Sequence, residues 1–284
     1  MIPAAFDYLR PSTVEDAAAA LAEAGDEAKV LAGGQSLLPL LRLRLASPSL
    51  LVDIGGLAQL RGIRVEDDVL AIGAMTTHAE VSSSAEVQAD APLLAAAAGA
   101  VGDRQVRHRG TLGGSLAHAD PAGDLPAVKL ALDAQLVLAG SGGRRTVGAA
   151  DFFTDYFTTA LAGDELLVEV RVPRLSSWGA CYEKFHRTAQ AWATVGVAAV
   201  VRRENGSIAE ARVALTNVGP TPVRAVAVEQ ALAGADATAE AIAAASGHAA
   251  EGTNPTSDLA ASAEFRKHLA RVLTRRALHA AAGL

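Results

Sequence analysis

Residues 109–126 read RGTLGGSLAHADPAGDLP, and this stretch decides more about the fold than any other part of the chain. Two adjacent glycines, Gly113 and Gly114, lie between Thr111 and Ser115. Glycine permits positive φ and a close approach of the backbone to a ligand, so that successive N–H groups can converge on an anion. The hydroxyl side chains would add further donors. The stretch therefore indicates a loop that holds a phosphate group.

A loop of the same type occurs earlier in the chain, where residues 32–36 read AGGQS. It follows an expected strand (residues 29–32) and precedes an expected helix (residues 37–46), whose N-terminus would add a partial positive charge. The loop lacks both the Gly-Lys-Ser/Thr of a Walker A loop and the Gly-x-Gly-x-x-Gly of a Rossmann turn. A tight strand–helix turn explains one such pair of glycines equally well. Two such loops could also face one diphosphate from opposite sides, and their spacing leaves both interpretations open.

The surrounding sequence predicts a mixture of helices and strands in two domains. A capping box, Ser12 to Glu15, should begin the first helix. Two hairpins are expected in the middle of the chain, and three long antiparallel strands followed by helices are expected after residue 177, with a hairpin turn at Asn205-Gly206. The expected strands and helices of this second half are residues 180–185, 192–202 and 208–218, and helices starting near 223, 238 and 263.

Composition and charge exclude several classes of protein. The chain has 284 residues and a net charge of −6, which argues against binding to nucleic acid or to an anionic membrane. No apolar stretch is long enough to span a bilayer, and the N-terminus does not resemble a signal peptide, so we expect a cytoplasmic location. The single cysteine, Cys181, means that this chain alone cannot hold an iron–sulfur cluster or a cysteine-based zinc site.

Five segments together closely resemble one protein family. They are AGGQSLLP (32–39), the stretch at 109–126, YEK (182–184), WAT (192–194) and NVGPTPVR (217–224). In this order they resemble the FAD-binding medium subunit of molybdenum hydroxylases, the relatives of carbon monoxide dehydrogenase and xanthine dehydrogenase. The resemblance extends over nearly the whole chain.

The resemblance implies an α+β fold. Residues 1–176 would form an FAD-binding domain of the vanillyl-alcohol-oxidase (PCMH) type, with subdomains of about 1–55 and 56–176. Residues 177–284 would form a C-terminal α+β domain with a three-stranded antiparallel sheet and helices.

The resemblance also implies which residues hold the FAD, which would be bound noncovalently. Both glycine loops would bind its diphosphate, Asp124 would contact the adenosine side, and Lys184 would lie by the flavin ring. Many members of the family have Asn where this chain has Ser115, and both side chains can donate to a phosphate oxygen. The loop residues are Ala32, Gly33, Gly34, Gln35 and Ser36 in the first loop, and Thr111, Leu112, Gly113, Gly114 and Ser115 in the second.

Other polar residues carry weaker hypotheses. Tyr182 could touch the flavin or simply pack in the core, and His118 is expected to order its loop rather than act as a base beside Asp120. The basic residues of the segment 104–109 are either solvated or a docking surface for a partner. We predict no catalytic residue and no metal ligand in this chain.

The function implied is that of an electron-transfer subunit. A large subunit would carry the molybdenum cofactor, a small subunit would carry two [2Fe–2S] clusters, and the FAD would pass electrons to an external acceptor, in a dimer of heterotrimers. A free-standing FAD-dependent oxidoreductase that acts directly on a small substrate is the alternative. A non-catalytic nucleotide-binding protein is a third hypothesis.

Overall fold

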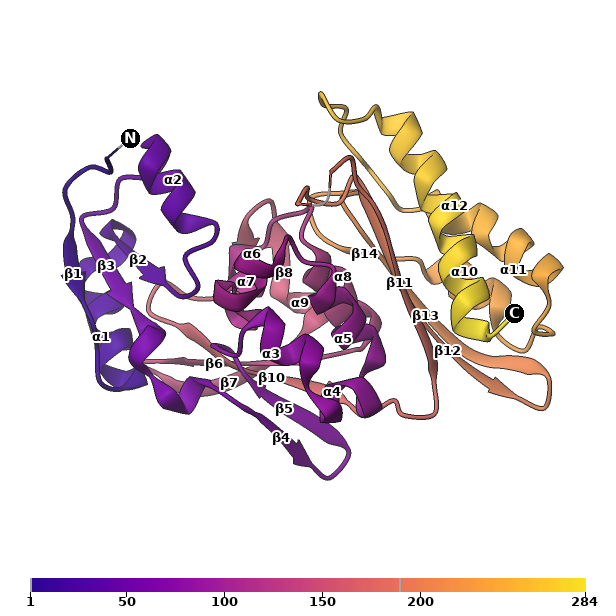
Figure 1. Cartoon of the computed structure of the whole chain (residues 1–284), viewed down its shortest axis with the longest axis horizontal. Coiled ribbons are helices and arrows are strands. Elements are labelled where there is room, and N and C mark those ends of the chain that lie inside the picture. The colour runs from indigo at the N-terminus through magenta and orange to yellow at the C-terminus, as the bar shows by residue number, and fades with distance from the viewer. Residues whose placement is uncertain (1, 189) are drawn as a thin grey trace.

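The computed structural model describes residues 2–188 and 190–284. Its strands form a three-stranded sheet, a five-stranded sheet, a four-stranded sheet and a small two-stranded ribbon. The three larger sheets follow one another along the long axis of the molecule, each accompanied by helices (Figure 1). The described part of the chain therefore has the α+β fold that we expected.

The N-terminal layer is a parallel sheet in the order β1-β3-β2. Helix α1 begins one residue later than predicted, because Thr13 rather than Ser12 accepts the capping hydrogen bond from Asp16 N–H at 3.0 Å. The first glycine loop connects β2 to α2. The elements of this layer are β1 (Asp7–Leu9), α1 (Val14–Ala24), β2 (Ala28–Leu31), α2 (Leu37–Leu43) and β3 (Leu50–Asp53).

The middle layer is an antiparallel sheet in the order β4-β5-β10-β6-β7. Both predicted hairpins are present, with Val65 paired to Leu70 and Leu136 paired to Val147. The strands are β4 (Ile63–Glu66), β5 (Val69–Gly73), β6 (Gln135–Gly140), β7 (Gly143–Gly148) and β10 (Leu166–Pro173), and the ribbon is β8 (Phe153–Asp155) with β9 (Thr158–Thr159).

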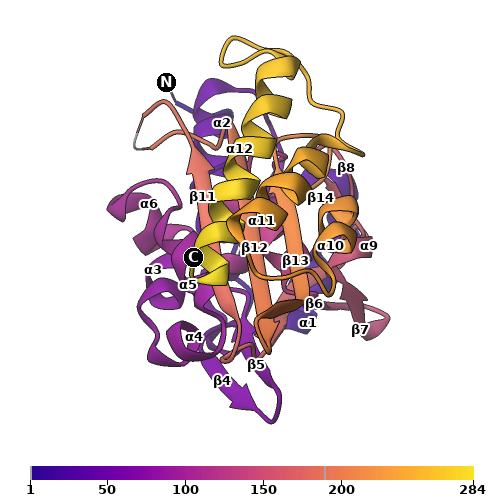
Figure 2. The same cartoon turned by 90° about the vertical axis from the view of Figure 1, so that its right-hand side faces the viewer.

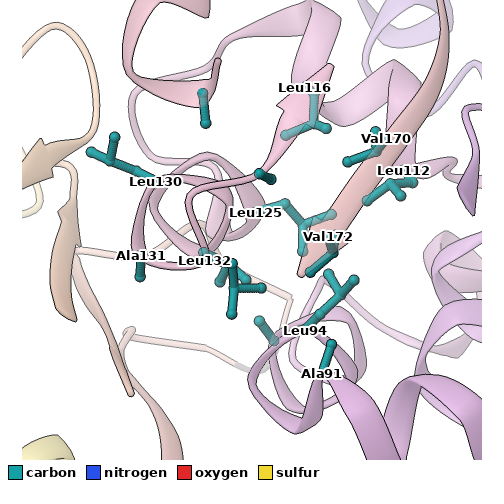
Figure 3. Close-up of a cluster of buried hydrophobic side chains, with 14 of the residues drawn as sticks. Ala91, Leu94, Leu112, Leu116, Leu125, Leu130, Ala131, Leu132, Val170 and Val172 are labelled. Atoms are coloured by element: carbon teal, nitrogen blue, oxygen red, sulfur yellow. The ribbon is translucent and has the colours of Figure 1, made fainter. Parts of the chain in front are cut away.

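Short helices occupy the region between β5 and β6. The alanine-rich sequence at 92–101 predicts the helix found there as α5, whereas the polar segment 102–110 suggests a loop and contains α6. Asp103 caps α6 by accepting from Val106 N–H at 2.8 Å, and Thr111 caps α7 by accepting from Gly114 N–H at 3.1 Å. The apolar side chains of α7 and α8 pack with β10 in a continuous core (Figure 3). These helices are α3 (His78–Ser83), α4 (Ala85–Asp90), α5 (Pro92–Gly99), α6 (Arg104–Arg109), α7 (Leu112–His118) and α8 (Asp124–Ala131), and a further short helix, α9 (Ala149–Phe152), follows β7.

The C-terminal part is an antiparallel sheet in the order β11-β12-β13-β14. Three long strands were expected, and the two-residue β14 extends them to four. The turn at Asn205-Gly206 is confirmed, since both residues have positive φ (50° and 86°). The elements are β11 (Gly179–Phe185), β12 (Val195–Glu204), β13 (Ser207–Thr216), β14 (Val223–Arg224), α10 (Val226–Leu232), α11 (Ala239–Ser246) and α12 (Ala263–Ala282).

The two faces of this C-terminal sheet have different neighbours. Helices α10, α11 and α12 cover the outer face, with α12 crossing β11 and β12 (Figure 2). The inner face packs against α5 and α8, and Ala198, Val200 and Ala214 belong to the core of the middle layer. The C-terminal part is thus joined to the layer that contains the second glycine loop. No helix in the described ranges has both the length and the apolar character that crossing a bilayer requires.

Candidate functional site

The two glycine loops lie in direct contact, although 76 residues separate Gly33 from Arg109 in the sequence. A Cβ atom added to Gly33 would stand 2.3 Å from the carbonyl oxygen of Arg109 and 2.8 Å from the Cα of Gly110. A Cβ atom on Gly114 would stand 3.3 Å from the Cβ of Ala32. Glycine is therefore required where the loops touch, and the fold brings both loops to one place.

The first loop presents backbone donors that no described residue satisfies. Nothing in residues 2–188 and 190–284 accepts from the N–H groups of Gly33, Gly34, Gln35 or Ser36. Gly34 has a φ of 75°, a conformation that glycine adopts without strain and that turns successive N–H groups toward a common point. These residues are only partly buried or exposed, so a ligand can reach them. The loop therefore has the donor set of an anion site.

The second loop differs from our expectation, because its backbone donors are already used within the protein. Leu112 N–H donates to Thr76 O at 2.9 Å, and Gly113 N–H donates to Ala74 O at 2.7 Å. Gly114 N–H and Ser115 N–H donate to the side chain and the carbonyl of Thr111, both at 3.1 Å. The N–H groups of the second loop thus anchor α7. What this loop can offer a ligand is the Ser115 hydroxyl and close contact with the first loop.

A buried histidine, His78, packs against Gly110 at the start of the second loop. His78 N–H donates to Gly110 O at 3.0 Å, and a Cβ on Gly110 would stand 2.8 Å from the imidazole of His78. Burial lowers the pKa of His78 to about 4, with smaller contributions from Lys129 and Arg107. The imidazole is therefore neutral at physiological pH and acts as packing for the loop. No motif in the sequence pointed to this residue.

Asp124, Tyr182 and Lys184 form a buried cluster between α8 and β11. Asp124 accepts from Tyr182 Oη at 2.6 Å and from Lys184 Nζ at 2.9 Å, and Lys184 Nζ also donates to Ala100 O at 3.2 Å. Burial raises the pKa of Asp124, while Lys184 and then Tyr182 act to lower it again. Burial also raises the pKa of Tyr182 well above its usual value. The cluster joins the middle layer to the C-terminal sheet.

This contact relates two residues of the expected site to each other. The resemblance placed Asp124 at the adenosine side of FAD and Lys184 by the flavin ring, which are opposite ends of the cofactor. The two side chains meet at 2.9 Å, so they occupy a single place in the fold. They form one buried ion pair, and the separate roles expected for them beside the adenosine and the flavin ring stay predictions.

The loop that precedes α8 is held by the end of β13. Thr216 Oγ1 lies 2.8 Å from Pro121 O and 2.6 Å from Gly123 O, and Asn217 N–H donates to Pro121 O at 2.8 Å. The C-terminal part thereby fixes the chain between the second glycine loop and Asp124. The segment 217–224 carries the family resemblance, but nothing in its sequence indicates this role of Asn217.

The remaining candidates have structural explanations. His118 Nε2 lies 3.9 Å from Asp120, beyond hydrogen-bond range, while Asp120 accepts from Ala122 N–H at 2.9 Å and so orders the turn. Arg107 donates to Val101 O and Gly102 O, which removes it from the proposed basic docking surface. Burial raises the pKa of Cys181 to about 11. In the described ranges, no group of His, Cys, Asp or Glu side chains is arranged to hold a metal ion.

Comparison with family models decides the family. Residues 4–175 match the FAD binding domain in molybdopterin dehydrogenase, and residues 180–281 match the CO dehydrogenase flavoprotein C-terminal domain. The chain belongs to this family of FAD-binding flavoprotein subunits. The expected cofactor, FAD, is thereby confirmed at the level of the family.

Relatives from this flavoprotein family match the chain over nearly their whole length. The chain is 44% identical to the carbon monoxide dehydrogenase medium chain of Hydrogenophaga pseudoflava, over 99% of this chain and 98% of the relative. It is 39% identical to subunit alpha of the 6-hydroxypseudooxynicotine dehydrogenase complex of Paenarthrobacter nicotinovorans, over 98% and 95% of the two chains. These relatives are subunits of molybdenum-containing dehydrogenases and hydroxylases, and they act on different substrates.

Solved structures agree with this assignment. Carbon monoxide dehydrogenase from Hydrogenophaga pseudoflava superposes with a TM-score of 0.97 at 46% identity, covering 99% of this chain and 98% of that chain. Quinoline 2-oxidoreductase from Pseudomonas putida 86 superposes with a TM-score of 0.95 at 35% identity, covering 100% and 99%. The flavoprotein fold is thus the same in complexes with different substrates.

Proposed function

We propose that this chain is the FAD-carrying electron-transfer subunit of a molybdenum hydroxylase complex. Its FAD receives electrons from the [2Fe–2S] clusters of a small subunit, after substrate oxidation at the molybdenum cofactor of a large subunit, and passes them to an external acceptor. We further propose a dimer of heterotrimers located in the cytoplasm, with domains at residues 1–176 and 177–284. The observation that carries this proposal is the contact between the two glycine loops, with unpaired N–H groups in the first.

The residues of the first loop fit the diphosphate of FAD. Four consecutive N–H groups, from Gly33 to Ser36, have no acceptor in the described part of the chain, and backbone N–H groups are effective phosphate donors. Ser115 adds a hydroxyl from the adjoining loop. Bound FAD can exchange one or two electrons, which suits a junction between one-electron clusters and a molybdenum centre. The protein's role is to bind and orient it.

The cluster of Asp124, Tyr182 and Lys184 is the proposed electrostatic neighbour of the cofactor. Because Lys184 is paired with Asp124, the two charges partly cancel, and the net field on a nearby flavin is weaker than that of a free lysine. Tyr182 holds the carboxylate in place through its hydroxyl. This chain would therefore tune the flavin without supplying a proton donor or an acceptor to a substrate.

The proposal that the two glycine loops form a cradle for the FAD diphosphate is tested by comparing Gly34→Asp with Gly34→Asn. Both substitutions carry the same strain at a φ of 75°, and Asn tolerates this conformation at least as well as Asp. Only Asp places a negative charge against the phosphates. We expect the Asp variant to lose its absorbance near 450 nm while the Asn variant retains part of it. Equal flavin content in two folded variants would contradict the cradle.

The composition of the purified complex tests the wider proposal. The protein isolated from its native host should bring with it two other chains, together with iron and molybdenum. A catalytically active, flavin-containing homo-oligomer without metals would instead support a free-standing oxidoreductase. A folded protein without flavin would support a non-catalytic nucleotide-binding protein.

A further inference from the structure

Helix α12 has a charge opposite to that of the protein around it. It contains five Lys or Arg residues and one Glu, a net charge of +4, whereas the whole chain has a net charge of −6. One of the five, Arg266, is buried and paired with Asp258 at 2.7 Å. Helix α12 lies on the outside of the C-terminal sheet (Figure 2), and its other four basic residues are exposed or partly exposed, so its outer face is a basic strip on an acidic molecule.

Local structure does not account for these charges. Cations at the C-terminal end of a helix are favoured by its dipole, but the effect is confined to the last turn. Only His279 lies in that turn of α12. Among the residues that the structure describes, no carboxylate forms an ion pair with Arg271, Arg275 or Arg276. Arg271 Nε donates to Gly247 O at 3.2 Å, and the exposed Arg275 and Arg276 leave their charge available to another molecule.

Exposed aromatic rings continue the strip at its N-terminal end. The rings of Phe185 and Phe265 meet edge to face with centroids 6.0 Å apart, and Phe265 stacks on His268 at 6.4 Å. Phe185 and Phe265 are 38% and 41% exposed. We call the row of Phe185, Phe265, His268, Arg271 and Arg275 the α12 stripe. Exposed aromatic and arginine side chains are the residue types that contribute most of the binding energy at protein interfaces.

The stripe begins beside the proposed flavin environment. Phe185 follows Lys184 directly on β11, and Phe185 O accepts from Thr194 N–H at 2.8 Å, in the same loop as Trp192, which is 52% exposed. The two side chains point to opposite faces of edge strand β11, Lys184 to Asp124 and Phe185 to Phe265, so a partner at this end of the stripe would lie across that strand from the ion pair. An acidic protein would be repelled by most of this molecule and attracted here, which would steer it to this position.

We propose that the α12 stripe is the docking surface for an acidic electron-carrier protein, the external acceptor of this subunit. The proposal rests on the proposed function. Each fully reduced flavin would give two electrons, one to each of two carrier molecules, and would release its protons to solvent. Arg271 and Arg275 would attract the carrier, and Phe185 with Phe265 would supply the apolar centre of the contact.

Direct binding tests the surface independently of turnover. The probe is an oxidised, acidic [2Fe–2S] ferredoxin, titrated into the full chain by calorimetry at several salt concentrations. We expect Arg271→Glu/Arg275→Glu to weaken binding at least tenfold and to flatten its salt dependence, and Phe265→Ser to weaken binding without changing that dependence. The control Arg42→Glu/Arg144→Glu makes the same charge change at exposed positions on α2 and β7 and should bind as the unmodified chain does.

The outcomes separate this proposal from the proposed function. Unchanged ferredoxin binding in the α12 variant, or equal loss in the control, would overturn the docking surface. Binding of duplex DNA or anionic vesicles in place of ferredoxin would overturn it as well. Retention of FAD, measured on the same samples, reports on the proposed function and should be the same in every variant.

Discussion

Asp124 and Lys184 meet at 2.9 Å in a buried ion pair that joins the first turn of α8 to strand β11. Removing one partner of a buried pair leaves the other charge without compensation, at a cost of about 3–5 kcal/mol. We expect Asp124→Asn to lower the free energy of unfolding by that amount in urea titrations. The double variant Asp124→Asn/Lys184→Met should recover part of the loss. As a control, Glu264→Gln removes an exposed partner of Lys267 and should have little effect.

The Asp124–Lys184 pair is also expected to influence the midpoint potential of the flavin. A cation near a flavin favours its reduced, anionic form and raises its midpoint potential. Lys184→Met leaves the carboxylate of Asp124 and should lower the potential in a spectroelectrochemical titration of the flavin-loaded protein. Lys29→Met, at an exposed position on β2, should leave it unchanged. An unchanged midpoint potential in the Lys184 variant would mean that the pair does not lie near the flavin.

Lys129 should make stability depend on pH. Its side chain is fully buried, no described residue forms a hydrogen bond with it, and burial lowers its pKa to about 7 from 10.5. Between these values the unfolded chain binds more protons than the folded one, so stability rises with pH, by about 1.4 kcal/mol per pH unit. Below about pH 7 this dependence ends, because both states are protonated.

The substitution Lys129→Met should remove the dependence of stability on pH that Lys129 causes. We expect the variant to be more stable than the unmodified protein by about 4–5 kcal/mol at pH 7, and by much less at pH 10, in urea unfolding. Lys29→Met should not change the slope. A stability difference that is the same at both pH values would show that Lys129 does not titrate in this range.

Gly33 lies where the two glycine loops touch, so a methyl group there should separate them. An added Cβ would stand 2.3 Å from a backbone oxygen, which can move only with its loop. We expect Gly33→Ala to lose FAD on gel filtration while its circular dichroism stays the same. Gly142→Ala provides the control, since an added Cβ at this hairpin position meets nothing within 4 Å. Full retention of FAD by Gly33→Ala would mean that the cradle does not need this contact.

Thr216 is expected to act on the cofactor site from the other domain. Thr216→Val keeps the shape of the buried side chain but loses the hydroxyl that lies between Pro121 O and Gly123 O. A buried carbonyl that loses its donor costs about 1–3 kcal/mol. Thermal unfolding should show this loss, and FAD should dissociate faster in stopped-flow dilution. Unchanged FAD dissociation would limit Thr216 to a role in stability.

The sequence predicted those parts of the structure that depend on local patterns of residues. Alternating apolar residues and the Asn205-Gly206 turn specify the hairpins, and the repeated glycine loops indicated where to look for the site. It did not predict α7, because the helix begins with Leu-Gly-Gly, and packing of Leu112 and Leu116 in the core outweighs the poor helix propensity of glycine. Nor did it show that the N–H groups of Leu112 and Gly113 are already paired, since their acceptors, at Thr76 and Ala74, are distant in sequence.

The ion pair was missed for a similar reason. Asp124 and Lys184 are 60 residues apart, and each was assigned a separate role by resemblance. Only the packing of α8 against the C-terminal sheet brings the two side chains together. Long-range contacts of this kind leave no signature in a single sequence.

Thr216 and Asn217, at the end of β13, hydrogen-bond to residues 121–123, and these bonds can form only late in synthesis. The ribosome releases both glycine loops well before Thr216 and Asn217, so the segment between the second loop and Asp124 lacks its hydrogen-bond partners while the rest is being made. Flavin is accordingly expected to enter only after synthesis has passed residue 217. A nascent chain arrested before that point should be colourless.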